Sequence, residues 1–223
     1  REFRNFDDGV EIGTRNIKVA LRRLRAWARD GARHELDLGG TIRATADRGY
    51  LDVQTRPERR NGVKVLLFLD VGGSMDPHVR VVSELFSAAR DAFRHLECFY
   101  FHNCLYEGVW RDNARRWNAQ TPTWEVLHTY GPDYRAIFVG DASMSPYEIA
   151  MAGGANEHWN AEPGQLWLER ARAQWPRNLW INPVPEAQWG HTRSIAMIGE
   201  IFEGAMVPMT LAGLGAGMQR LAR

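Results

Sequence analysis

The segment Val65–His78, with the sequence VLLFLDVGGSMDPH, constrains the fold more than any other part of the chain. It opens with an unbroken apolar run, and such a run bounded by glycines predicts a strand buried on both faces of a parallel sheet. Asp70 and Ser74 follow this run, at the edge where open α/β sheets bind ligands. Carboxylate and hydroxyl oxygens in a glycine turn suit Mg²⁺ better than they suit nucleophilic chemistry.

The rest of the chain alternates predicted strands with predicted helices. Apolar runs predict further strands at 98–101, 105–110, 134–139, 178–182 and 206–209. Helical spacing predicts helices at 14–30, 79–96, 122–130, 165–174, 192–202 and 210–221, with a short one opening at Ser145-Pro146. Residues 41–55 predict a hairpin that turns at Asp47-Arg48-Gly49. This order predicts an α/β fold whose mostly parallel sheet carries helices on both faces.

Composition sets the broad class of the protein. The chain has 223 residues, of which 44% are hydrophobic and 25% charged, so a globular core is expected. A net charge of +1 argues against a general nucleic-acid-binding surface. Cys98 and Cys104 provide neither a disulfide framework nor a zinc quartet, which fits a cytoplasmic protein. We expect no membrane span and no signal peptide. A first residue of Arg is compatible with a piece of a longer protein.

A second predicted strand also ends in an acid, because Asp141 follows the run at 134–139. Thr121, with Thr123 as the second choice, begins the helix that precedes this strand. The carboxyl ends of parallel strands share one edge, so Asp70, Ser74, Thr121 and Asp141 can converge there. Carboxylates, hydroxyls and water can build the octahedral oxygen shell that Mg²⁺ prefers. Such a shell leaves a position that a partner's carboxylate can fill.

The segment Asp70–Met75, DVGGSM, resembles the D-x-S-x-S motif of von Willebrand factor A (VWA) domains. In that family the motif opens the metal-ion-dependent adhesion site. By this resemblance Thr121 corresponds to the family's later threonine, and Asp141, in VGDASM, to its second aspartate. The segments TIRAT, from Thr41, and VPMTLAGL, Val207–Leu214, are similar to the CoxE-like subgroup. The likeness covers most of the chain.

The resemblance implies a three-layer, Rossmann-like VWA domain over residues 61–223. Residues 1–60 are then an N-terminal extension, a helix and a hairpin, that packs on the main domain. Asp70 and Ser74 would ligate Mg²⁺, or Mn²⁺, directly, while Thr121 and Asp141 would do so directly or through water. The resemblance also implies a non-catalytic bacterial protein of the cytoplasm. Its expected partners are a MoxR-type AAA+ ATPase and a client enzyme whose maturation or metal-cofactor loading the pair assists.

One departure from the family leaves other functions open. Gly72 stands where the family motif has its first serine, so one hydroxyl ligand is missing. Either a water takes its place, or the site binds metal weakly or not at all. The second reading favours a metal-independent interaction scaffold of the same fold. A metal-dependent phosphohydrolase using Asp70 and Asp141 is a further alternative, although no general base or phosphate-binding cation stands beside these motifs.

Tryptophans gather near the predicted ligand edge. The residues concerned are Trp117, Trp124, Trp159 and Trp189. They either cover the ends of the sheet or form an aromatic rim around the metal site, since tryptophan is favoured in interface hot spots.

Overall fold

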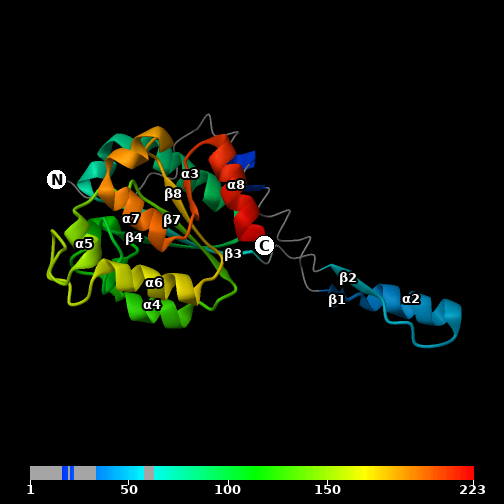
Figure 1. Ribbon diagram of the computed structural model, residues 1–223. Coiled ribbons are helices and arrows are strands. Elements are labelled where there is room, and N and C mark those ends of the chain that lie inside the picture. Colours follow the sequence, from blue (N-terminus) through cyan, green and yellow to red (C-terminus); the bar gives the residue numbers. More distant parts are fainter. Residues whose placement is uncertain (1–16, 20, 23–33, 58–62) are drawn as a thin grey trace.

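A seven-stranded sheet forms the centre of the computed structural model, which describes residues 17–19, 21–22, 34–57 and 63–223 (Figure 1). The strand order is β6-β5-β4-β3-β7-β8-β9. The strands are β3 (Lys64–Asp70), β4 (His95–Phe101), β5 (Gly108–Trp110), β6 (Gln120–Pro122), β7 (Tyr134–Val139), β8 (Asn178–Asn182) and β9 (Met206–Pro208). Strand β3 pairs in parallel with both β4 and β7, and β8 and β9 continue in parallel. Towards one edge of the described sheet, β5 pairs antiparallel with both β4 and β6.

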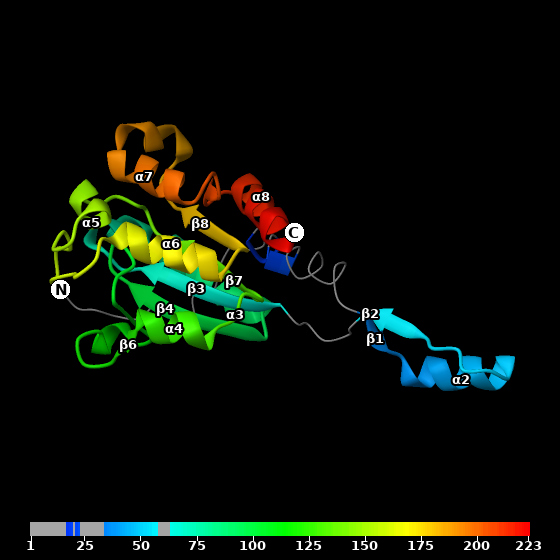
Figure 2. The same cartoon turned by 60° about the horizontal axis from the view of Figure 1, so that its bottom comes forward.

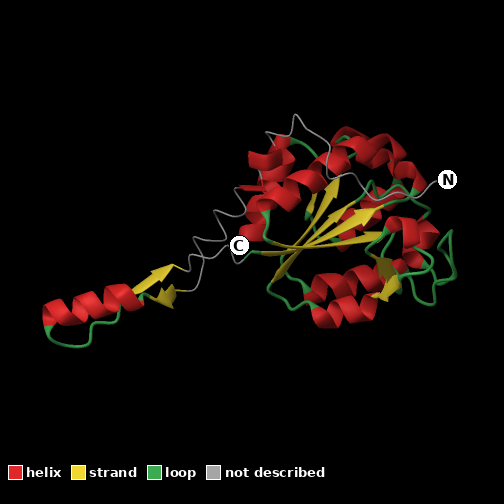
Figure 3. Cartoon of the chain, turned by 180° about the vertical axis from the view of Figure 1, so that it is seen from behind, coloured by secondary structure: helices red, strands yellow, loops and turns green. Residues whose placement is uncertain are grey.

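Helices cover both faces of this sheet (Figure 3). On one face α3 (Val79–Ala92) and α8 (Leu211–Ala222) pack in one core cluster together with Ile17 and Leu21. The other face is covered by α4 (Thr123–Thr129), α5 (Pro146–Ala150), α6 (Gly164–Gln174) and α7 (Arg193–Ile201). Figure 2 shows the strands passing between these layers. The predicted α/β fold with a mostly parallel, doubly covered sheet is therefore confirmed.

The apolar run of β3 is explained by burial on both faces. Val65, Leu67 and Leu69 join the core cluster under α3, whereas Leu66 and Phe68 join the opposite cluster. Successive side chains of a strand point to opposite faces of the sheet. A central strand whose sheet is covered by helices on both faces therefore needs apolar residues at every position.

A ladder of aromatic rings crosses three neighbouring strands, β3, β7 and β8. Phe68 on β3 is paired with Phe138 on β7, which is paired with Trp180 on β8. The Phe68 and Phe138 ring centroids lie 4.7 Å apart, and those of Phe138 and Trp180 lie 5.9 Å apart, with both pairs stacked. Slipping one strand by one residue would turn these rings to the other face. The ladder therefore fixes the register that brings the ends of β3 and β7 to one edge.

The hairpin predicted at residues 41–55 is wrong. Instead α2 (Leu38–Arg48) occupies the first part, flanked by two short antiparallel strands, β1 (His34–Leu36) and β2 (Thr55–Pro57). The Asp37 side chain accepts from Gly40 N–H at 3.0 Å and caps the helix start. Gly49, with φ of 73°, ends the helix in the left-handed conformation. The Asp47-Arg48-Gly49 signal thus stops a helix and does not join two strands.

Smaller differences concern element ends. The helix predicted at 79–96 stops at Ala92, so β4 begins earlier than expected, and the short strand β6 was not expected. Of the helix predicted at 14–30, only residues 17–19 and 21–22 are described, and they are helical. The division at residue 60 and the packing of the extension on the main domain stay predictions. Among the described helices, none combines the length and apolarity that a membrane crossing requires.

Candidate functional site

Asp70 ends β3 in a fully buried position, with an exposed fraction of 0%. Its Oδ1 accepts hydrogen bonds from Gly72 N–H at 2.8 Å and from Asn103 N–H at 2.9 Å. Its Oδ2 is buried and has no hydrogen-bond partner among the described residues. A buried carboxylate oxygen left in this way is costly, so the site favours either a proton or a cation at Oδ2.

Asp141 lies beside Asp70, just after β7. Its Oδ1 accepts from Ser143 N–H at 3.0 Å, and Ser74 also hydrogen-bonds to its side chain. Its backbone carbonyl accepts from Asn182 Nδ2 at 2.9 Å, which ties the loop to the end of β8. Three of the four residues predicted to ligate a metal, Asp70, Ser74 and Asp141, are thus brought together.

Burial makes both carboxylates costly to ionise. Burial raises the pKa of Asp70 from 3.8 to about 7, and the charge of Asp141 adds to the effect. Burial also raises the pKa of Asp141, although the hydrogen bonds from Ser143 and Ser74 oppose this. Two buried acids of this kind ionise together most readily when a cation lies between them.

An open pocket of about 600 Å³ lies at the same edge of the sheet. It is lined by Gly73, Ser74, His102, Asn103, Ser143, Met144, Ser145, Glu148, Asn156, Glu157 and Thr192. Oxygen and amide groups dominate this lining, and the described residues in it include no lysine or arginine.

Thr121 and Thr123 are placed differently from Asp70, Ser74 and Asp141. Thr121 belongs to β6, where it pairs with Val109, and β6 is separated from β3 by two strands. The buried hydroxyl of Thr123 donates to the Tyr106 carbonyl. Neither threonine lines the pocket. Their role as ligands stays a prediction.

Two polar residues of the site were missed by the sequence analysis, Asn103 and Glu148. The Asn103 amide donates to both carboxylate oxygens of Glu148, at 3.2 and 3.0 Å. Glu148 also accepts from Ser145 N–H and from Asn156 Nδ2, and it is fully buried. Glu148 could have been noticed because Ser145 and Glu148 have capping-box spacing. Asn103 could have been noticed because it lies just past the end of the strand β4, close to the position that Asp70 has at the end of β3.

We expect Glu148→Ala to destabilise the chain by roughly 1–3 kcal/mol, because it leaves the buried Asn103 amide without its acceptor. The measurement is the free energy of unfolding in urea. Glu125→Ala, on the exposed side of α4, serves as the control and should change it by less than about 0.5 kcal/mol. An equally small effect at Glu148 would show that the Asn103–Glu148 pair does not support the site.

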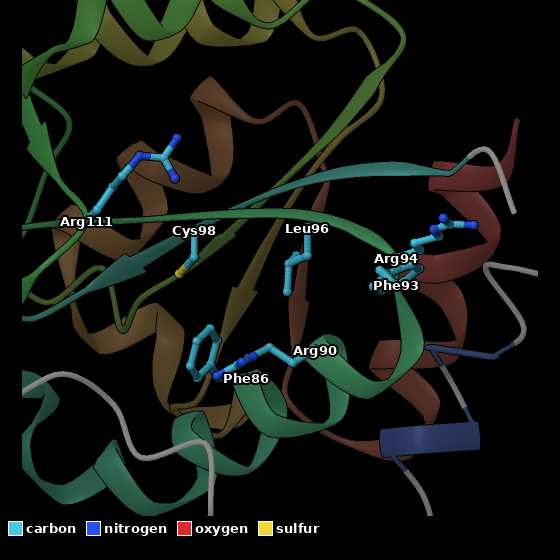
Figure 4. A pocket seen from close by; sticks show the side chains of 7 residues that line it. All are labelled: Phe86, Arg90, Phe93, Arg94, Leu96, Cys98 and Arg111. Atoms are coloured by element: carbon cyan, nitrogen blue, oxygen red, sulfur yellow. The ribbon is translucent and has the colours of Figure 1, made fainter.

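A second cavity, of about 450 Å³, has a different character (Figure 4). Figure 4 shows Phe86 and Arg90 on α3 facing Leu96 and Cys98 on β4. Burial raises the pKa of Cys98 to about 12, so its thiol is poorly suited to nucleophilic chemistry. This cavity lies between α3 and β4 and shares no lining residue with the acidic site.

The tryptophans at this end of the molecule do not line the acidic pocket. Trp124 packs edge-on against Trp167 at 5.3 Å, and the Trp189 indole donates to the Val184 carbonyl at 2.9 Å. Trp117, Trp124 and Trp159 are exposed, and the Arg116 guanidinium lies 4.8 Å from the centroid of the Trp117 ring. Such contacts are those of residues that cover the ends of the sheet.

The donor set suits a hard cation. Among the described residues, no three His, Cys, Asp or Glu side chains are grouped so as to hold a metal ion. The acidic site instead offers two buried carboxylates, Asp70 and Asp141, with neutral oxygens from hydroxyl and amide groups beside them. Mg²⁺ commonly uses one or two carboxylates and keeps several waters, whereas zinc requires a fuller set of nitrogen or sulfur ligands.

Comparison with known proteins agrees with this arrangement. Residues 11–107 match a family model described as "VWA domain containing CoxE-like protein". No curated protein and no solved structure matches the chain. The matched segment includes β3, the DVGGS turn and β4, and the strands that follow complete a mostly parallel sheet with helices on both faces. Residues 11–107 therefore match the CoxE-like VWA family, and the seven-stranded, mostly parallel sheet with helices on both faces fits a three-layer VWA fold.

Proposed function

We propose that this chain is a non-catalytic protein-interaction module that binds its partner through Mg²⁺ at the acidic site. Asp70 and Ser74 hold the ion, Asp141 does so directly or through water, and Thr121 is the remaining predicted ligand. When bound, Mg²⁺ supplies positive charge and an open coordination position. A carboxylate of the partner fits that position.

The observation that carries this proposal is the unpartnered Oδ2 of Asp70. It is buried, and the neighbouring Asp141 carboxylate is buried as well. Both acids lie at the edge of the sheet where the DVGGS turn opens to an exposed Ser74. A protein that kept two buried acids for stability alone would gain little, because burial makes each of them costly to ionise.

The nature of the pocket lining favours binding over hydrolysis. Beside a metal ion, phosphohydrolases commonly use lysine or arginine to stabilise the charge that develops on phosphate, and the described lining residues supply only neutral and acidic groups beside His102. The choice of partner follows from the CoxE-like family. We propose a MoxR-type AAA+ ATPase, with which the chain assists maturation or metal-cofactor loading of a client enzyme.

We expect Asp141→Ala to weaken association with the MoxR-type ATPase at least about tenfold while the domain stays folded, because it removes one of two carboxylates that hold the cation. The measurement is a pull-down of the purified ATPase, in Mg²⁺ and in EDTA. Asp91→Ala is the matched control, since Asp91 lies exposed on α3 and pairs with Lys18.

The outcomes of this experiment separate the candidate functions. Loss of association both in EDTA and in Asp141→Ala supports a metal-dependent module. Association that survives EDTA and Asp141→Ala would instead indicate a metal-independent scaffold. Turnover of a phosphate ester that Asp70→Ala abolishes would indicate a phosphohydrolase.

A further inference from the structure

The space beside Gly72 is occupied by the side chain of Asn103. A Cβ placed on Gly72 would lie 1.9 Å from Asn103 Oδ1 and 3.1 Å from Asn103 Cγ. The backbone of Gly72, with φ of −57° and ψ of 159°, is one that any residue adopts. Glycine at this position is therefore required by the space that Asn103 fills, and not by the conformation of the turn.

Asn103 is held so that its amide oxygen faces the acidic site. Its backbone N–H donates to Asp70 Oδ1, and its Nδ2 donates to Glu148. A carboxylate only accepts hydrogen bonds, so Glu148 fixes which end of the amide is Nδ2 and turns Oδ1 the other way. The residue has φ of 57°, a conformation that asparagine tolerates better than most residues do.

The amide oxygen takes space that a serine side chain at position 72 would need. The same hypothetical Cβ on Gly72 is 1.9 Å from Asn103 Oδ1 and 3.2 Å from Asp70 Oδ1, so both oxygens lie next to the position of the missing side chain. Asn103 and Ser74 line the same pocket. A side-chain carbonyl and a hydroxyl are both neutral oxygen donors, and hard cations accept either.

We infer that Asn103 Oδ1 replaces the first serine hydroxyl of the D-x-S-x-S motif as a metal-ligating oxygen, and that Gly72 is the residue that makes room for it. This assignment rests on the proposed Mg²⁺ site and completes it. The chain has thus moved one ligand from the turn after β3 to the turn after β4, instead of losing it.

The test measures Mn²⁺ binding to the full chain through the decrease of the EPR signal of the free ion. Asn103→Gly removes the amide without straining the positive φ, and it is expected to weaken Mn²⁺ binding roughly 10- to 100-fold. The double variant Gly72→Ser/Asn103→Gly places a hydroxyl in the vacated space and is expected to recover most of the affinity. Gly72→Ser alone is expected to lower the melting temperature, because its Cβ and Asn103 Oδ1 cannot share the space.

Each result decides between the assignments. Wild-type binding that Asn103→Gly retains would overturn the role of Asn103 and leave the proposed Mg²⁺ site standing. The same conclusion follows if a folded double variant, checked by its melting curve, fails to recover affinity, since Asn103 would then act only by supporting Glu148. A wild-type chain that binds no Mn²⁺ would overturn both the proposed function and this assignment.

Discussion

Asp70→Asn is expected to make the metal-free protein more stable at pH 8 than the wild type. Burial and the charge of Asp141 raise the pKa of Asp70 to about 7 in the folded state, against 3.8 ordinarily. The folded state therefore binds this proton more tightly than the unfolded state does. The free energy of unfolding falls as the pH rises from about 3.8 through about 7, and then levels off. Asparagine keeps the acceptor for Gly72 and Asn103 N–H but cannot ionise.

The expected gain of Asp70→Asn at pH 8 is at most about 4 kcal/mol, and it should shrink towards pH 5. It is measured by urea denaturation in EDTA. Asp91→Asn, at an exposed ion pair with Lys18, is the control and should show little pH dependence. Wild-type stability that does not fall between pH 5 and pH 8 would contradict the burial of an ionising Asp70.

Magnesium should reduce the stability advantage of Asp70→Asn at pH 8. At a concentration 100 times its dissociation constant, Mg²⁺ stabilises a chain that binds it only when folded by about 2.7 kcal/mol. The wild type should gain this amount at pH 8, and Asp70→Asn should gain nothing. A residue whose removal stabilises the empty protein and abolishes binding is one retained for function rather than for the fold.

Phe138→Ala is expected to have the largest effect on the fold, a loss of about 3–5 kcal/mol in the free energy of unfolding. Phe138 is fully buried and contacts Phe68, Trp180 and Phe202 through its ring. Removing the ring leaves a cavity in the ladder that fixes the register of β3, β7 and β8. The measurement is the urea unfolding midpoint.

Tyr147→Ala provides the control for this prediction, because Tyr147 is an aromatic residue with an exposed fraction of 66%. It should change stability by less than about 0.5 kcal/mol. A Phe138→Ala variant that unfolds at the same urea concentration as Tyr147→Ala would show that the ring ladder contributes little to the stability of the sheet.

The fold was predictable where the signal is local and strong. The apolar run of β3 is buried on both faces of the sheet, so its sequence has no spacing of polar residues that would indicate a helix or a half-exposed strand. The hairpin at 41–55 failed because its glycine ends a helix, and the distinction depends on the cap that Asp37 forms. Short amphipathic segments carry weak periodicity, and capping then decides between helix and strand.

The site was predictable only for residues that a strand end or a motif marks. Asp70, Ser74 and Asp141 follow strands, and the structure brings them together. Asn103 and Glu148 are 45 positions apart in the sequence and meet only because β4 and α5 reach one edge of the folded sheet. No spacing rule connects them. The space that Asn103 takes beside Gly72 becomes visible only in three dimensions.

The proposed metal site can be observed directly in a crystal structure of the chain soaked in Mn²⁺, with anomalous scattering used to locate the ion. We predict an anomalous peak beside Asp70 Oδ2 and Asp141, with Ser74 and Asn103 oxygens in its coordination shell. A peak elsewhere, or an acidic site that stays without one at saturating Mn²⁺, would show that Asp70 and Asp141 do not form a metal site.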